Sequence, residues 1–195
     1  AGEEGGRRMQ SRFWPLPASR RSAVRDRRQG ELNMVLAARR RGWVIVATFI
    51  AALLLDIAPL PSWIVLFRPE WTAIVLIYWC LALPQRVGVG IGWSVGLIVD
   101  VLRGALLGQH ALGYAVIAYL ALKLHRRIRV FPIWQQALSV MVFIALHQLL
   151  VLWVLGMIGQ SRGSFAYWLP TLSSALLWPW MFAVLRGVRR RFHVT

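Results

Sequence analysis

A single acidic residue interrupts the longest stretch of the sequence that combines apolar residues with glycines. Between Pro84 and Gly113, the apolar run that begins at Val87 contains one carboxylate, Asp100. A charge at the centre of a membrane-inserted helix costs about 2.5–3.5 kcal/mol on insertion scales, so such residues usually have a specific role. Three roles remain open for Asp100: a proton or ion site, a contact for a partner, or a helix-end acid that hydrogen-bonds the following loop and fixes its shape.

The segment after Asp100, residues 103–112, is predicted to be a loop. With Asp100 we take four of its residues as candidates for a structural or partner-interface site: Arg103, Gly104, Gly108 and His110. If Asp100 acts through a hydrogen bond, Asp100→Asn should keep the fold, whereas Asp100→Leu should weaken assembly with partners.

Other patterns that carry chemistry are missing from the sequence. His110 and His147 are isolated, and no spacing of His, Cys and carboxylate residues supplies converging metal ligands. No nucleophile–base pair or phosphate-binding loop stands out, so we predict a protein that is not an enzyme and has no cofactor. The glycines before Asp100 instead predict close approach of a neighbouring helix, through Gly88, Gly92 and Gly96.

The composition places these residues in a membrane protein. Hydrophobic residues make up 58% of the 195 residues and charged residues 15%, compared with roughly 45–50% and 25% in soluble domains. Eleven tryptophans are typical of interfacial anchors. The only cysteine, Cys80, lies in an apolar run, so no disulfide framework is possible.

Apolar runs and proline-containing turns predict an all-α, polytopic bundle of six transmembrane helices. The turn at Gln85 and Arg86 is very short, so the second and third spans should be antiparallel neighbours. A short apolar piece before the second span is predicted to be interfacial or to extend that span back to residue 63. The six predicted spans are 43–60, 71–83, 87–102, 113–124, 134–157 and 165–185.

The distribution of charge orients these spans. With six spans, cytoplasmic segments contain twelve Lys and Arg residues and outer segments contain three, Arg68, Arg103 and Arg162. This bias follows the positive-inside rule and predicts that both termini are cytoplasmic, which also explains the basic runs without nucleic acid. The densest internal cluster is predicted to be a cytoplasmic loop that can contact an acidic partner or anionic lipid: Lys123, Arg126, Arg127 and Arg129.

The first 33 residues differ from the rest. They contain eight arginines and four acids without apolar periodicity, which predicts a disordered basic extension. We expect Met34 to be the natural start and residues 34–195 to form a single integral membrane domain. The alternative is a basic cytoplasmic tail that touches anionic lipid.

Residues 34–195 resemble the MreD family, the rod shape-determining inner-membrane proteins of Gram-negative bacteria. The resemblance covers nearly all of the chain after Met34, in order and at the family's spacing. The segment around Asp100, Gly104 and Gly108 matches the family's most recognisable signature. The other matching segments are GWVIV at 42–46, FRPEW at 67–71, IYWCLALPQRVGVG at 77–90, GLIVDVLRGALLGQHAL at 96–112, IAYLALK at 117–123, WQQAL at 134–138 and LLWPWMF at 176–182.

The resemblance implies a non-enzymatic scaffold subunit of the cell-elongation complex in the inner membrane. It implies binding to MreC and, with it, a link from MreB filaments to RodA and its transpeptidase partner. The family's topology is also similar to that of the substrate-binding subunits of energy-coupling-factor transporters. A subunit of that kind, binding a small molecule, is therefore the alternative function, although few polar residues lie within the predicted spans.

Overall fold

Every element in the described part of the chain is helical. The computed structural model describes residues 42–59, 61, 67–159 and 165–192, together with Arg25 and Gln29. The predictions for residues 1–33, for the piece at residue 63 and for the chain end thus lie largely or wholly outside the described residues. The helices are Gly42–Ile57, α3 (Trp71–Ala82), α4 (Val89–Arg103), α5 (Gln109–Ile128), α6 (Ile133–Met157) and α7 (Leu169–Arg191), with a 3₁₀ turn at Phe165–Trp168 before α7.

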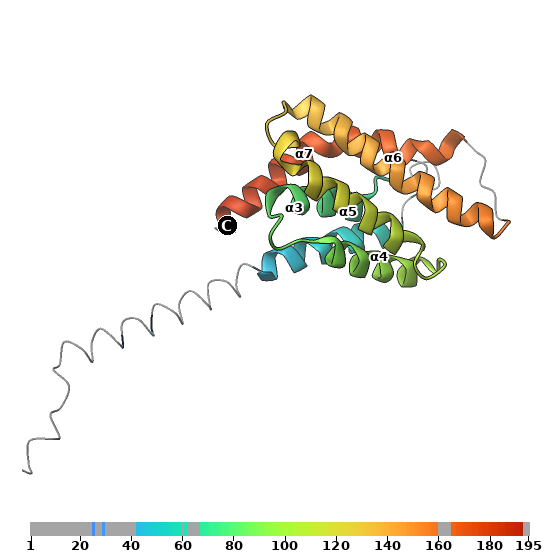
Figure 1. The fold of residues 1–195 in the computed structure, drawn as a ribbon, viewed down its shortest axis with the longest axis horizontal. Helices are drawn as coiled ribbons and strands as arrows, with labels where there is room; N and C mark the ends of the chain where they lie inside the picture. The colour runs from blue at the N-terminus through green and yellow to red at the C-terminus, as the bar shows by residue number, and fades with distance from the viewer. Residues whose placement is uncertain are drawn as a thin grey trace, which may run out of the picture. The chain divides into compact units, whose positions relative to one another are not determined.

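The chain divides into two units, Ala1–Gly42 and Trp43–Thr195, and the helices after Gly42 belong to the second. Within this second unit α3 is the central helix, packed against α5, α6 and α7 (Figure 1). It contains no charged residue, and ten of its twelve side chains are buried. The Gly42–Ile57 helix joins it through a hydrogen bond from the Trp79 indole nitrogen to the Thr48 hydroxyl, 2.9 Å. A helix that is apolar on all sides fits this enclosed position.

Glycines bring α4 against α5. An ideal Cβ on Gly96 would lie 2.3 Å from the Ala111 Cα atom, and one on Gly92 would lie 2.9 Å from the Tyr114 carbonyl oxygen. Gly88 is the residue that caps the start of α4, and a Cβ there would meet none of the described atoms within 4 Å. The expected pairing of the second and third spans is wrong, because α3 packs on α5 and α7 while α4 packs along α5.

Two predicted loops are shorter than expected. The loop after α4 covers residues 104–108, because Gln109–Leu112 already form the first turn of α5. Lys123, Arg126 and Arg127 lie in the last turns of α5 and only Arg129 follows it, so the predicted basic loop is mostly helix. The last four carbonyl groups of a helix favour nearby cations, which stabilises this basic helix end.

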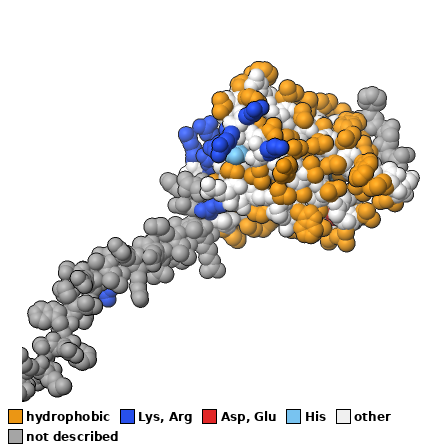
Figure 2. Space-filling model, in the orientation of Figure 1, with side chains coloured by type: hydrophobic (Ala, Val, Ile, Leu, Met, Phe, Trp, Pro, Cys, Tyr) orange, Lys and Arg blue, Asp and Glu red, His pale blue; other side chains and the backbone are white. Residues whose placement is uncertain are grey.

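At one end of the bundle, side-chain contacts bring the C-terminal ends of two helices against the N-terminal ends of three others. The end of Gly42–Ile57 and the end of α4 meet the starts of α3, α5 and α7, as the contacts of Asp56, Glu70 and Arg103 show. The basic residues that end α5 and α7 lie at the opposite end of the bundle. In Figure 2 the Lys and Arg side chains of this unit gather toward one end of the visible face, and hydrophobic side chains cover most of the rest.

Two of the described helices are long and apolar enough to cross a membrane, Ile133–Met157 and Ala166–Arg191. Gly42–Ile57 and Trp71–Ala82 are apolar but shorter. The all-helical fold is therefore confirmed for the described residues, and the count of six spans stays a prediction.

Candidate functional site

The carboxylate of Asp100 caps the start of α5 from the neighbouring helix. It is fully buried, at 0% exposure. Its Oδ2 atom accepts from the backbone nitrogens of Gly108 (2.9 Å) and Ala111 (3.3 Å), and its Oδ1 atom accepts from that of His110 (2.8 Å). These N–H groups belong to the first turn of a helix, which has no partners for them within the helix. The residue that caps the start of α5 is Gly108, which has no side chain to accept from these groups.

Two glycines shape the loop that makes this contact possible. Gly104 ends α4 with φ of 59°, and Gly108 starts α5 with φ of 100°. Both angles lie in the left-handed region that glycine adopts without strain. The Gly104 nitrogen and the Ala105 nitrogen donate back to the Asp100 carbonyl oxygen, so the side chain and main chain of Asp100 both hold the loop.

His110 connects Asp100 to Arg103. The His110 Nδ1 atom lies 2.8 Å from Asp100 Oδ1, and its Nε2 atom lies 3.4 Å from Arg103 Nη1. Because arginine only donates, Nε2 is the acceptor and Nδ1 carries the hydrogen. His110 precedes the predicted span 113–124, and burial together with the Arg103 guanidinium lowers its pKa. The imidazole is therefore neutral near pH 7.

Arg103 in turn reaches two further acids. Its Nη2 atom lies 3.4 Å from Glu70 Oε2 and 3.8 Å from Asp56 Oδ1. Glu70 lies just before the predicted span 71–83. Burial is the largest single influence and alone would raise its pKa, but the surrounding basic groups, with the Arg103 guanidinium foremost, together outweigh burial and lower the pKa. Glu70 is thus ionised and pairs with Arg103.

Asp56 and Glu70 also fasten neighbouring helices. Asp56 Oδ2 accepts from both the hydroxyl and the backbone nitrogen of Thr72, the latter at 3.2 Å. The Glu70 nitrogen donates to the Ser174 hydroxyl on α7, 3.0 Å. We call Asp56, Glu70, Asp100, Arg103 and His110 the polar cluster.

Sequence reasoning found three members of the polar cluster, Asp100, Arg103 and His110, and missed Asp56 and Glu70. The sequence alone assigned no role to Asp56 or Glu70. Arg68, which lies nearby in the sequence, donates to the carbonyl oxygens of Leu55 (2.9 Å) and Ala58 (3.2 Å). One signal in the sequence pointed to the cluster: all three acids of residues 34–195 fall near the predicted outer ends of spans.

The predicted basic contacts lie elsewhere. Lys123, Arg126, Arg127 and Arg129 are at the far end of α5, about 20–28 Å from His110 at 1.5 Å per residue. His147 lies next to the cluster, with its ring centroid 5.6 Å from that of His110. Gln148 accepts a hydrogen bond from Thr171, so this part of α6 is bonded to the neighbouring helix α7.

The polar cluster fixes geometry and leaves apolar surface beside it. Hydrogen bonds tie its acids to four helix ends and to the loop. At the loop tip and on the adjoining turn of α4, however, Leu107 is 69% exposed and Val101 is 68% exposed. Exposed apolar side chains continue along α4 at Trp93 and Ile98. The arrangement is suited to presenting one rigid apolar face to lipid or to another helix.

Comparison with known proteins identifies the family. Residues 38–188 match the family model described as rod shape-determining protein MreD. The chain is also 34% identical over 152 residues to the rod shape-determining protein MreD of Haemophilus influenzae, which covers 76% of this chain and 92% of that protein. The chain belongs to the MreD family. No solved structure matches it.

The matched residues include the whole polar cluster and all the helices from Gly42 onward, except the last three residues of α7. MreD proteins are shape-determining proteins. Family membership and the two long apolar helices together point to association with a membrane.

Proposed function

We propose that this MreD-family chain is a six-span scaffold in the bacterial inner membrane that acts in maintaining rod cell shape. In this proposal it binds MreC and helps couple MreB filaments to RodA and its transpeptidase partner in peptidoglycan synthesis. Family membership supports the role in cell shape. The alternative, a small-molecule-binding transporter subunit, gains no support from the matched proteins.

One structural observation supports a docking role: the exposed apolar face of α4. The polar cluster and the close contacts of Gly92 and Gly96 hold α4 rigidly on α5. The opposite side of α4 exposes Trp93, Ile98 and Val101. A preformed face pays little ordering entropy on binding, so it suits a transmembrane helix such as that of MreC. Within membranes such contacts depend on van der Waals packing, for which a rigid face is favourable.

Co-purification tests this proposal. The full chain is tagged, expressed in its native host and extracted in mild detergent, and the bound proteins are identified by mass spectrometry. We expect MreC with RodA and its transpeptidase. The double variant Ile98→Trp with Val101→Trp, which enlarges the α4 face without adding charge, should reduce MreC recovery about tenfold.

The matched control is Val142→Trp, an equally apolar enlargement at an exposed position of α6. It should leave MreC recovery unchanged. Equal recovery of MreC with the α4 variant would rule out this face as the docking site. Recovery of an ATPase module in place of MreC would overturn the scaffold function itself.

A further inference from the structure

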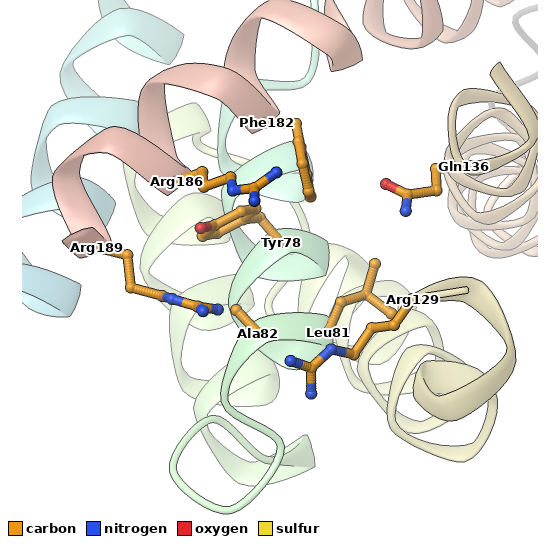
Figure 3. Close-up of a pocket in the computed structure, with 8 residues that line it drawn as sticks. All are labelled: Tyr78, Leu81, Ala82, Arg129, Gln136, Phe182, Arg186 and Arg189. Atoms are coloured by element: carbon orange, nitrogen blue, oxygen red, sulfur yellow. The ribbon is translucent and has the colours of Figure 1, made fainter. Parts of the chain in front are cut away.

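The bundle end opposite the polar cluster contains a cavity with three arginines. It has a volume of about 240 Å³ and lies between α3, the end of α5, the start of α6 and the last third of α7. Arg186 and Arg189 come from α7, and Arg129 follows α5. In Figure 3 the guanidinium group of Arg186 lies beside Tyr78, that of Arg189 near Ala82 and that of Arg129 near Leu81. We call Arg129, Arg186 and Arg189 with this cavity the arginine pocket.

Among the residues that the structure describes, no Asp or Glu lies near this pocket. After Asp100 the sequence contains no Asp or Glu at all. The three acids of residues 34–195 all belong to the polar cluster, about 28 Å away along α5 at 1.5 Å per residue. That distance exceeds the screening length of about 8 Å at physiological ionic strength. The four remaining acids lie in residues 1–33, a segment whose net charge is +4.

Three like charges around one cavity therefore need an anion from outside the bundle. Among the described residues, the ion pairs involve Arg103 and His110 and none of the three pocket arginines. Guanidinium groups recognise phosphate oxygens through paired, charge-assisted hydrogen bonds. The positive charge and the N–H donors of the pocket are of the kind that binds a phosphate group.

Gln136 adds a second requirement. Its side chain is buried at 6% exposure, and its Nε2 atom donates to the carbonyl oxygens of Ile128 (3.2 Å) and Phe131 (3.1 Å). These two bonds fix the amide, so its Oε1 atom points toward the pocket (Figure 3). Oε1 has no hydrogen-bond partner among the described atoms, and a buried acceptor left unpaired is unfavourable by about 1–3 kcal/mol. The ligand should therefore bring a donor beside its phosphate.

The surroundings favour a lipid over a solute. The pocket lies between the start of α6 and the end of α7, the two helices able to cross a membrane. Val130, Phe131 and Trp134 are exposed beside it, and Val130 is 83% exposed. Arginine next to exposed aromatic residues is typical of headgroup depth. The cavity is smaller than the roughly 300–1,000 Å³ that encloses a drug-sized ligand, so it accommodates a headgroup whose acyl chains remain outside.

We propose that the arginine pocket binds the headgroup of a phospholipid that carries an O–H or N–H donor next to its phosphate, as glycerol and ethanolamine headgroups do. The arginines hold the phosphate, and Gln136 accepts from the donor. This inference needs the chain to lie in a membrane but is independent of MreC.

Lipid binding to the purified full-length protein tests the proposal. Native mass spectrometry and thermal unfolding in a neutral detergent are measured with phosphatidylglycerol, phosphatidylethanolamine, phosphatidylcholine and inorganic phosphate. The first two should bind in a one-to-one complex and raise the unfolding temperature. Phosphatidylcholine has a phosphate but no donor, and it should bind about tenfold more weakly.

The double variant Arg186→Gln with Arg189→Gln should weaken binding of phosphatidylglycerol about tenfold or more. The matched control, Arg126→Gln with Arg127→Gln, removes the same charge at the same end of the bundle but outside the pocket. It should change binding little. Both variants should unfold, without lipid, near the temperature of the unsubstituted protein.

Three outcomes would overturn the inference. Equal weakening by both double variants would mean diffuse electrostatic attraction without a site. Equal stabilisation by inorganic phosphate would mean that the pocket takes a soluble anion. Equal binding of phosphatidylcholine and phosphatidylglycerol would remove the role of Gln136.

Discussion

Asp100 acts on the protein through the donors that surround it. Its two oxygens accept from four N–H groups. Three are backbone groups of Gly108, His110 and Ala111, and the fourth is the imidazole Nδ1–H of His110. A carboxylate satisfies this ring of donors, since both oxygens are acceptors. The negative charge also interacts favourably with the positive end of the α5 dipole.

This ring changes the expected effect of Asp100→Asn. The amide replaces one acceptor oxygen by an NH₂ group that faces backbone N–H donors, so Asn should lower the free energy of unfolding by about 1–3 kcal/mol. Leu leaves all four donors without an acceptor and should be more destabilising than Asn. Thermal unfolding in detergent measures both variants, with Ser94→Ala on the exposed side of α4 as control. An Asp100→Leu protein as stable as the unsubstituted one would contradict this account.

At the scale of single residues, the sequence predicted what local chemistry dictates. An acid followed by glycines within an apolar run is unusual, and this drew attention to Asp100, Arg103 and His110. Asp56 and Glu70 were missed because their contact with Arg103 depends on tertiary packing; Glu70 and Arg103 are 33 positions apart. No local pattern encodes that pairing.

At the scale of elements, the glycines spaced four residues apart on α4 allow it to pack closely against α5. Four-residue spacing predicts a close helix contact but does not name the neighbour. The short turn at Gln85 and Arg86 suggested α3 as the neighbour of α4, but α3 packs against α5 and α7. Helix existence and approximate position were predictable from hydropathy, whereas helix neighbours and the first turn of α5 were not.

Two glycines on α4 provide a matched test of this packing. Gly96→Ala places a Cβ 2.3 Å from the Ala111 backbone, so α4 and α5 must separate, which should reduce the free energy of unfolding by about 1–3 kcal/mol. At Gly90 a Cβ would meet none of the described atoms within 4 Å. Gly90→Ala should therefore be neutral or stabilising by up to about 1 kcal/mol, because alanine favours helix. Equal unfolding temperatures for the two variants would refute the packing argument.

At the scale of the whole molecule, charge divides the bundle into two ends. The acids of residues 34–195 lie with Arg103 at one end, and the basic residues of α5 and α7 lie at the other. The sequence alone predicted the bias in basic residues. It did not predict that the acids come together, because that depends on which helix ends are neighbours.

Thiol labelling tests the predicted orientation. Leu107 in the loop after α4 and Val130 after α5 are highly exposed, and the native Cys80 is fully buried and should not react. In spheroplasts, which lack the outer membrane but keep the inner membrane intact, a membrane-impermeant maleimide should label Leu107→Cys and not Val130→Cys. Permeabilised cells should give labelling of both. Labelling of both positions in intact spheroplasts would contradict the prediction that the two ends of the bundle lie on opposite sides of the inner membrane.

The separation of the acids from most of the arginines also makes the energy of the inserted protein depend on the membrane potential, which is negative on the cytoplasmic side. Moving one positive charge outward against 100 mV requires about 2.3 kcal/mol. An inverted molecule would have to carry the basic ends of α5 and α7 outward, while two described arginines, Arg68 and Arg103, moved inward with the three carboxylates of the polar cluster. In the predicted orientation, the voltage that a living cell maintains therefore favours insertion with the basic end of the bundle on the cytoplasmic side.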